Sequence, residues 1–346
     1  MAEDLKEQKC PACGAPLRFD PESGRSVCDW CGSSFEIPQG RTEELPTDHE
    51  APLSDEINVY NCLSCGAEII TDAVTASVNC PYCGNNIVIS DKVSGGLRPD
   101  GIIPFRIDRK RLPDAVKEFY KDKPLLPKHF FDESSLKDVV GVYVPFWLYG
   151  CDFSGRVEYE GYKDSSHREG DYIISERKNY RVVRDASMRF TDIPVDGSSR
   201  LDDALMDSVE PWDFSGVVPF NMSYLSGFCA ERFDKASDEV KNRADERMTS
   251  SAVGLVDAGA RAGYSGISRT RSGLRAHKLT TKYELLPVYT FSVDWHGKEY
   301  SFAMNGQTGK VVGDLPISKG KKLLLRWGVF AGVFALVLLI LSFLSC

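Results

Sequence analysis

Cys10-Pro-Ala-Cys13-Gly14 opens a short module that closes with Cys28-Asp-Trp-Cys31-Gly32, and the 346-residue chain then repeats this module. The second copy runs from Cys62-Leu-Ser-Cys65-Gly66 to Cys80-Pro-Tyr-Cys83-Gly84. Fourteen residues separate the two cysteine pairs in each copy, and the second copy lies 52 residues after the first at all four cysteines. This repeated spacing predicts two small β modules, each organised around four thiols.

Four thiols in two Cys-x-x-Cys turns are the usual ligand set of a structural zinc site. The glycine after each pair tolerates positive φ, so that the turn can direct its backbone N–H groups toward the sulfurs. Four protein ligands close a zinc site and leave no position for a catalytic water. We therefore predict two structural Zn²⁺ sites and no catalytic one, with the ligands Cys10, Cys13, Cys28, Cys31, Cys62, Cys65, Cys80 and Cys83.

Disulfides are the alternative interpretation of the eight cysteines. They need an oxidising compartment, and the N-terminal sequence Met-Ala-Glu-Asp-Leu-Lys contains no apolar signal-peptide segment. A thioredoxin-like redox site would use one Cys-x-x-Cys pair in a βαβ unit. The pattern favours zinc over both.

The C-terminal segment is strongly apolar. Residues 327–346 carry no charge, and twenty helical residues span about 30 Å, the thickness of a bilayer core. Basic residues precede this segment from Lys319 to Arg326, and the positive-inside rule places such a flank in the cytoplasm. We predict a transmembrane tail anchor at 323–346 with a basic flank from 319, a single-pass membrane location (the plasma membrane in a bacterium) and the N-terminal bulk in the cytoplasm. A buried core helix is the alternative.

The rest of the chain divides by composition. Residues 39–58 are rich in Pro, Thr, Asp and Glu and predict a flexible acidic linker. The region after about residue 100 is long enough to bury a core of its own. The predicted domains are zinc ribbon 1 (8–38), the acidic linker (39–58), zinc ribbon 2 (59–90), an α+β body (101–316) and the tail anchor (323–346).

Hydrophobic periodicity indicates an α+β body with an antiparallel sheet. Apolar residues recur at helical spacing over 112–120 and 234–253, and a capped short helix is expected at 198–209. The apolar run 142–149 predicts a strand, and strict alternation over 289–295 and 300–304 predicts a meander. The fold class predicted is thus multidomain: two β zinc ribbons, an α+β body and one transmembrane helix.

The body contains a weak internal sequence repeat. Ile102-Ile-Pro-Phe105 resembles Val217-Val-Pro-Phe220, and Val144-Pro-Phe-Trp147 resembles Leu286-Pro-Val-Tyr289. The intervals between the two motifs differ, so a single domain and a two-lobed duplicated domain both stay open.

No enzyme signature appears. The segment Gly306-Gln-Thr-Gly309-Lys310 lacks the first glycine and the final Ser or Thr of a Walker A loop and is better explained as a turn. Cys151 and Cys229 lie among apolar residues and are predicted to be core groups, since no base is placed near either of them by the sequence. We predict no catalytic and no cofactor-binding residues.

Charge argues against nucleic-acid binding by the ribbons. The chain has a net charge of −8. Residues 10–37 contain two basic and four acidic side chains, and 62–89 contain two acidic and no basic ones, whereas binding to nucleic acid depends on Lys and Arg. Trp30, Phe35 and Tyr82 could stack on bases, but packing is the favoured interpretation. The basic stretch 258–283 predicts a solvated mobile loop or, alternatively, a contact with anionic lipid or an acidic partner.

These features together resemble a bacterial family described as TFIIB-type zinc-ribbon-containing membrane proteins. The resemblance rests on the paired Cys-Pro-x-Cys-Gly ribbons, on the Val-Pro-Phe-Trp, Leu-Pro-Val-Tyr and Asn-Gly-Gln-Thr-Gly-Lys segments, and on the apolar terminal helix. Relatives are sometimes labelled a primosomal replication-restart helicase. This chain has no nucleotide-binding loop, and we reject that activity.

We therefore predict a tail-anchored, cytosol-facing zinc protein that acts as a non-enzymatic protein-interaction or scaffold module at the membrane. Its expected partners are the lipid bilayer through 323–346 and a protein of unknown identity, with nucleic acid disfavoured. The alternative is a membrane-tethered nucleic-acid-binding zinc-ribbon factor in transcription or replication. An enzyme on the α+β body is a third hypothesis, which a pocket of converging polar groups would favour.

Overall fold

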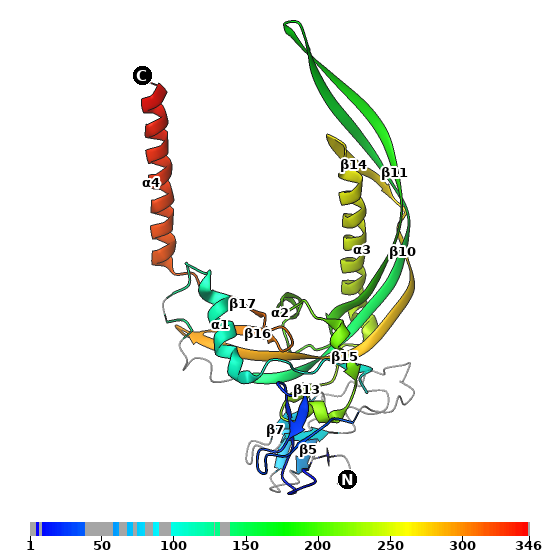
Figure 1. The fold of residues 1–346 in the computed structure, drawn as a ribbon, viewed down its shortest axis with the longest axis vertical. Helices are drawn as coiled ribbons and strands as arrows, with labels where there is room; N and C mark the ends of the chain where they lie inside the picture. The colour runs from blue at the N-terminus through cyan, green and yellow to red at the C-terminus, as the bar shows by residue number, and fades with distance from the viewer. Residues whose placement is uncertain are drawn as a thin grey trace.

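A computed structural model shows a mostly β fold with few helices (Figure 1). It describes residues 9–38, 98–127, 129–131 and 139–344, and the strands at 5–6, 58–61, 68–71, 75–79 and 86–89. The helices are α1 (Leu112–Lys121), α2 (Asp203–Ser208), α3 (Ser237–Arg261) and α4 (Lys319–Leu344). The strands up to β8 are β1 (Leu5–Lys6), β2 (Arg18–Asp20), β3 (Arg25–Val27), β4 (Ser34–Phe35), β5 (Asn58–Asn61), β6 (Glu68–Thr71), β7 (Thr75–Asn79) and β8 (Asn86–Ile89). The later strands are β9 (Gly101–Ile102), β10 (Val140–Glu169), β11 (Tyr172–Asp196), β12 (Val218–Pro219), β13 (Cys229–Glu231), β14 (Gly266–Ser272), β15 (Arg275–Trp295), β16 (Lys298–Asn305) and β17 (Val311–Gly313).

One mixed sheet of twelve strands organises the chain, in the order β1-β8-β7-β13-β10-β15-β16-β17. Strands β11 and β14 also pair with β10, and β9 joins β15 to β12. The antiparallel pair β10/β15 lies at the centre, in register from Val140↔Thr290 to Ser154↔Arg275. The second predicted ribbon and the body therefore share a sheet, because β7 of this ribbon pairs with β13 and β13 pairs with β10, whereas β2, β3 and β4 of the first ribbon form a separate three-stranded sheet.

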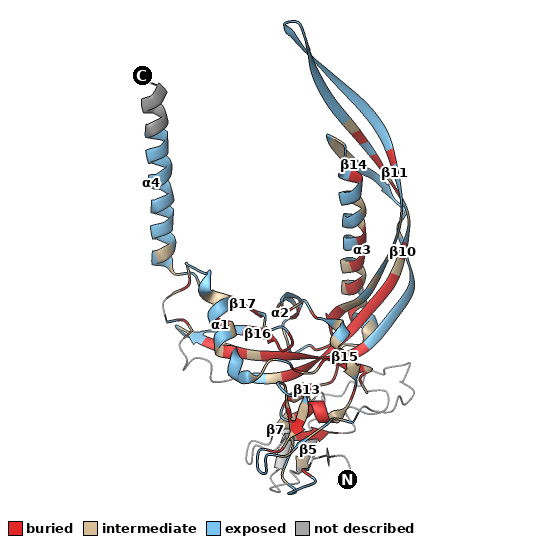
Figure 2. Ribbon diagram, viewed as in Figure 1, coloured by how far each residue is buried: buried red, intermediate tan, exposed pale blue. Residues whose placement is uncertain are grey.

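Both faces of the central pair are buried, which explains the near-continuous apolar run in β10. Odd-numbered residues such as Tyr143 and Trp147 face a core that includes residues of α1 and α3. Even-numbered residues such as Val144 and Phe146 face a second core that includes Met206 of α2. The alternation follows from the two-residue period of a strand. Figure 2 shows the buried residues gathered around this base of the sheet.

Strands β10 and β11 continue far beyond the base as a long hairpin (Figure 1). The pairing runs from Phe146↔Asp196 to Glu169↔Tyr172, with one irregularity after Tyr149. Arginine–carboxylate pairs link the two strands at 2.6–2.9 Å, in the sets Arg156–Asp185, Arg177–Asp164, Arg181–Glu158 and Arg189–Asp152. These opposite-charge cross-strand pairs favour the hairpin register on its solvent-exposed face.

Helix α3 packs along the inner side of the hairpin. Val157, Tyr159 and Val182 form a small buried cluster with Ala260 of the helix. The Tyr159 hydroxyl donates a hydrogen bond of 2.9 Å to Asp257, which fixes the end of the helix against the sheet. The helix thereby supports the lower part of an otherwise exposed arm.

The echoed sequence segments lie next to each other in space. Strand β9, which carries Ile102, pairs with β12 through Val218, and the other two matching segments, 144–147 and 286–289, face each other across β10/β15 as Val144↔Leu286. The order strand, helix, hairpin also occurs twice, once as β9-α1-β10-β11 and again from β12 through α3 to β15-β16. Both halves contribute strands to one sheet.

The predicted fold class is wrong. The fold is a mostly β mixed sheet with few helices and one described four-cysteine cluster, instead of independent ribbons beside an α+β body. The predicted helices correspond to α1, α2 and α3, but the strand expected at 142–149 is the base of the thirty-residue β10. Its last part, residues 163–169, is polar and exposed on both faces, and hydrophobic periodicity cannot detect such a strand.

The tail anchor predicted at 323–346 is contradicted as well, together with the single-pass location and the cytoplasmic orientation that depended on it. Within the described residues, no helix is long and apolar enough to span a membrane. The described side chains of α4 end at Leu338, and every eighteen-residue stretch from 319 to 338 holds at least three of the basic residues Lys319, Lys321, Lys322 and Arg326. The prediction assigns these charges to a flank before the helix, but they belong to α4 itself.

The basic stretch 258–283 is not a loop. It forms the end of α3, β14 and the first part of β15. Three of its cations are ion-paired: Arg269 with Asp257 at 2.9 Å, Lys278 with Asp152 at 3.6 Å and Lys282 with Asp192 at 3.2 Å. These pairs offset part of the positive charge that the sequence suggested for binding.

A buried carboxyl lies in the central sheet. Glu284 of β15 is 4% exposed and pairs with Phe146 on one side and Gly101 on the other. Burial raises the pKa of Glu284 to about 7, because the charged carboxylate loses its hydration. The folded protein therefore holds this proton more tightly than the unfolded chain does.

We expect the stability contributed by protonated Glu284 to be full below its ordinary pKa of 4.5 and to be lost as the pH rises through about 7. A Glu284→Gln variant should be more stable than the wild type at pH 8 by about 3 kcal/mol at most, and this difference should shrink toward pH 5. Urea unfolding across this pH range measures it. Glu299→Gln changes an exposed carboxyl and should show no such trend; a Glu284→Gln difference that is independent of pH would contradict the assignment.

Candidate metal centre

Strands β2, β3 and β4 form the sheet of the first ribbon, and two tight turns carry its cysteines. The Gly14 N–H donates to the Cys10 carbonyl at 2.8 Å, and the Gly32 N–H donates to the Cys28 carbonyl at 2.9 Å. Both glycines have positive φ, 75° and 72°, a backbone region that residues with a Cβ rarely adopt. The glycine after each pair is thus needed to close the turn that presents the two thiols together.

The four thiols of this ribbon converge. All the sulfur atoms of Cys10, Cys13, Cys28 and Cys31 lie within 4.8 Å of one another. The sulfurs of Cys10 and Cys31 are 3.6 Å apart, and those of Cys13 and Cys28 are 3.5 Å apart. A tetrahedral zinc with Zn–S bonds of about 2.3 Å places its sulfurs about 3.8 Å apart, whereas a disulfide needs about 2.05 Å. The donor set therefore fits a tetrahedral metal ion such as zinc.

The cluster has a buried side and an open side. Cys10 and Cys28 are buried, whereas Cys13 and Cys31 are exposed. The Ser33 hydroxyl lies 3.2 Å from the Cys31 sulfur, and hydrogen bonding from Ser33 lowers the pKa of Cys31 to about 6. A bound zinc ion would cross-link the two turns and supply structural stability.

The second predicted set, Cys62, Cys65, Cys80 and Cys83, lies outside the described residues. Its neighbouring strands are described: β5 pairs with β6, and β7 pairs with β8. The second zinc site stays a prediction from the repeated spacing. Within the described part of the chain, one four-cysteine cluster is present.

The first ribbon is anchored in the body through Phe19 of β2. This side chain is 2% exposed and belongs to the larger core. Its ring lies 5.3 Å from that of Tyr224 and 6.4 Å from that of Phe228. The Phe19 N–H donates to the Ser226 carbonyl at 2.8 Å, and the Asn221 amide donates to the Pro38 carbonyl at 2.9 Å. The ribbon is consequently held in a defined orientation and is not a freely hanging module.

Trp30 is the residue that the sequence interpretation misplaced. It lies between Cys28 and Cys31 in the second turn and is 85% exposed, where packing had been expected. The four residues between the paired cysteines of this ribbon, Pro11, Ala12, Asp29 and Trp30, are all exposed. The position of Trp30 within the turn could have predicted its exposure, whereas its apolar residue type suggested burial.

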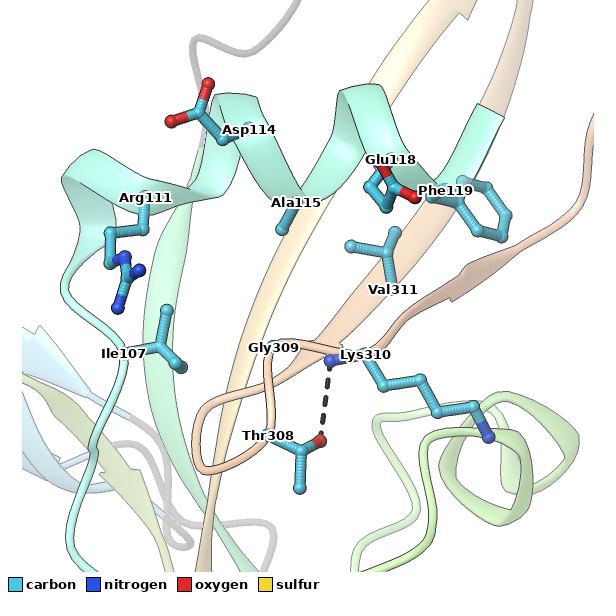
Figure 3. A pocket seen from close by; sticks show the side chains of 10 residues that line it. All are labelled: Ile107, Arg111, Asp114, Ala115, Glu118, Phe119, Thr308, Gly309, Lys310 and Val311. Carbon is cyan, nitrogen blue, oxygen red and sulfur yellow. Dashed lines mark hydrogen bonds between the residues drawn. The ribbon is translucent and has the colours of Figure 1, made fainter. Parts of the chain in front are cut away.

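A surface cavity of about 620 Å³ lies between α1 and the turn Thr308–Val311 (Figure 3). Its polar side chains do not converge on a common point. Asp114 points away from the turn, and Lys310 extends toward the neighbouring loop, where its ammonium group donates to the backbone carbonyls of Ser208 (2.8 Å) and Glu210. The Gly-Gln-Thr-Gly-Lys segment is thus a turn whose lysine caps a neighbouring loop.

The remaining described cysteines, Cys151 and Cys229, lie in strands of the large sheet. Cys151 is 3% exposed, and its sulfur lies 3.4 Å from the sulfur of Met248. Burial raises the pKa of Cys151, which favours the unreactive thiol. Cys229 is half-buried in β13 within the sheet.

The wild-type protein should bind two zinc ions, and a Cys28→Ser, Cys31→Ser variant should bind one, because it removes half of the ligands of the first site. Metal analysis after gel filtration measures the stoichiometry. Cys229→Ala, which alters a cysteine outside both predicted sites, should leave it unchanged. An unchanged zinc content in the double variant would rule out the first site.

The Phe19→Ala variant should be destabilised by about 3–5 kcal/mol, because it opens a cavity where the ribbon enters the core. Trp30→Ala in the same ribbon should change stability by no more than about 0.5 kcal/mol, since that side chain is exposed. Urea unfolding with zinc present compares them. Equal stabilities of the two variants would show that Phe19 does not anchor the ribbon.

No protein-family model and no solved structure matches the chain. The chain is 34% identical over 328 residues to the uncharacterised protein YdjG of Bacillus subtilis (strain 168), and the match covers 94% of each sequence. An identity of this size over nearly the full length of both proteins shows common descent. The chain belongs to the family of B. subtilis YdjG.

Proposed function

We propose that this YdjG-family protein is a non-enzymatic interaction or scaffold protein in which a zinc-stapled ribbon presents a binding face from a rigid β body. The observation that carries the proposal is the combination of a closed tetrathiolate cluster with the insertion of Phe19 into the body core. A metal with four protein ligands has no open position for a substrate or a water. Its contribution is to hold a surface in place.

The surroundings of two sets of polar groups support a non-enzymatic function. In the cavity beside α1, Asp114 and Lys310 diverge, and Lys310 is engaged by carbonyl groups. A charged cluster of the body, formed by Arg243 with Asp196, Asp203 and Asp207, joins α3 to α2 and the end of β11 through ion pairs of 2.9–3.1 Å. These contacts have a structural explanation.

Nucleic acid is the weaker partner class. In the first ribbon, both arginines contact acids: Arg18 lies 2.9 Å from Asp29, and Arg25 lies 3.6 Å from Glu36. Binding to nucleic acid would require cations free to neutralise phosphates. A protein partner is compatible with the acidic surface of the ribbon.

Proximity labelling in the native host, with the labelling enzyme fused to the full-length chain, tests the proposal. We expect a reproducible set of proteins that is labelled by the wild type and by Cys229→Ala and is lost with Cys28→Ser, Cys31→Ser. We expect this loss because the double variant removes two metal ligands and disrupts the binding face of the ribbon, while the body stays folded. Retention of the whole set by the double variant, enrichment of nucleic acid in place of protein, or no enrichment above the free labelling enzyme would each contradict the proposal.

A further inference from the structure

We propose that Trp30 and the acidic surface of the first ribbon form a docking site for a basic segment of a partner protein. This inference rests on the proposed function and names the face and the chemistry of the partner. Trp30 is 85% exposed, and tryptophan is enriched among the residues that dominate binding energy at protein interfaces. A large exposed indole on a rigid turn is suited to that role.

The turn around Trp30 is held on both sides. The Cys28 N–H donates to the Ser33 carbonyl at 2.9 Å, the Gly32 N–H donates to the Cys28 carbonyl, and a metal on Cys28 and Cys31 would close the turn covalently. The backbone under the indole therefore has little conformational freedom to lose on binding. Preorganisation of this kind increases affinity by reducing the entropic cost of association.

The charge of the face determines the partner. Residues 10–37 contain two basic and four acidic side chains, a net of −2, and one zinc ion with four thiolates adds a further −2. Asp29 and Glu36 next to the turn are 68% and 86% exposed, and each is also paired with an arginine of the ribbon, so the attraction for a partner comes from the net negative charge of the ribbon. A Lys or Arg side chain placed over the indole would gain a cation–π contact and long-range attraction to this net charge.

The same charges disfavour other occupants. A second copy of the chain would bring two acidic ribbons together, and like charges at an interface weaken it. Phosphate groups of nucleic acid would be repelled for the same reason. A basic protein segment with apolar side chains is the occupant that satisfies both the indole and the carboxylates.

Fluorescence anisotropy with the full-length, zinc-loaded protein tests the site. The probes are fluorescein-labelled peptides of repeated Arg-Leu-Lys, of repeated Ser-Leu-Gln and of repeated Glu-Leu-Asp, together with single-stranded DNA of similar length. We expect saturable binding of the Arg-Leu-Lys peptide alone. Trp30→Ala should weaken it about tenfold or more, and Trp30→Phe should weaken it less, because phenylalanine retains an aromatic face.

The matched control is Trp327→Ala, which removes another exposed tryptophan, 62% accessible on α4, and should leave binding unchanged. The inference is overturned if the basic peptide does not bind, if Trp30→Ala binds as the wild type does, or if the other peptides or DNA bind equally well. If proximity labelling nevertheless identifies partners that depend on Cys28 and Cys31, the proposed function stands and the partner uses another face of the ribbon.

Discussion

The antiparallel pairing of β10 with β15 is the constraint on which the rest of the structure depends. It runs from Val140↔Thr290 to Ser154↔Arg275, and both of its faces are buried over the apolar base. Five further strands pair with one of these two: β11, β13 and β14 with β10, and β9 and β16 with β15. A defect in this register would move the odd- and even-numbered side chains to the wrong cores, since a slip of one residue exchanges the two faces.

The ribbon depends on two different stabilising interactions. A metal on the four thiols would hold the turns, because a module this small buries too little apolar area to fold by itself. Phe19 then connects the ribbon to the aromatic cluster of Tyr224 and Phe228. Loss of the metal would release Trp30 from its fixed turn, whereas loss of Phe19 would release the ribbon from the body. The metal and Phe19 therefore have separate roles, and the position of the Trp30 indole depends on both.

Much of the regular structure was predictable. The apolar spacing at 112–120, the cap at 198–209 and the stripe at 234–253 correspond to α1, α2 and α3, and the alternation at 289–304 corresponds to β15 and β16. The outer part of β10/β11 was not predictable, because its cross-strand ion pairs carry no hydrophobic period. The tail anchor was predicted wrongly because the apolar terminal segment was considered without the basic residues in the first two turns of α4.

The sequence by itself determined the metal chemistry, since two Cys-x-x-Cys-Gly turns at fixed spacing can bring four thiols together whatever lies around them. It also determined the acidic character of the ribbon. Only the tertiary structure decided that Phe19 enters the body core, that the echoed segments share one sheet and that Trp30 faces solvent. Those outcomes depend on contacts between residues that are far apart in the sequence. The local spacing of residues does not predict such contacts.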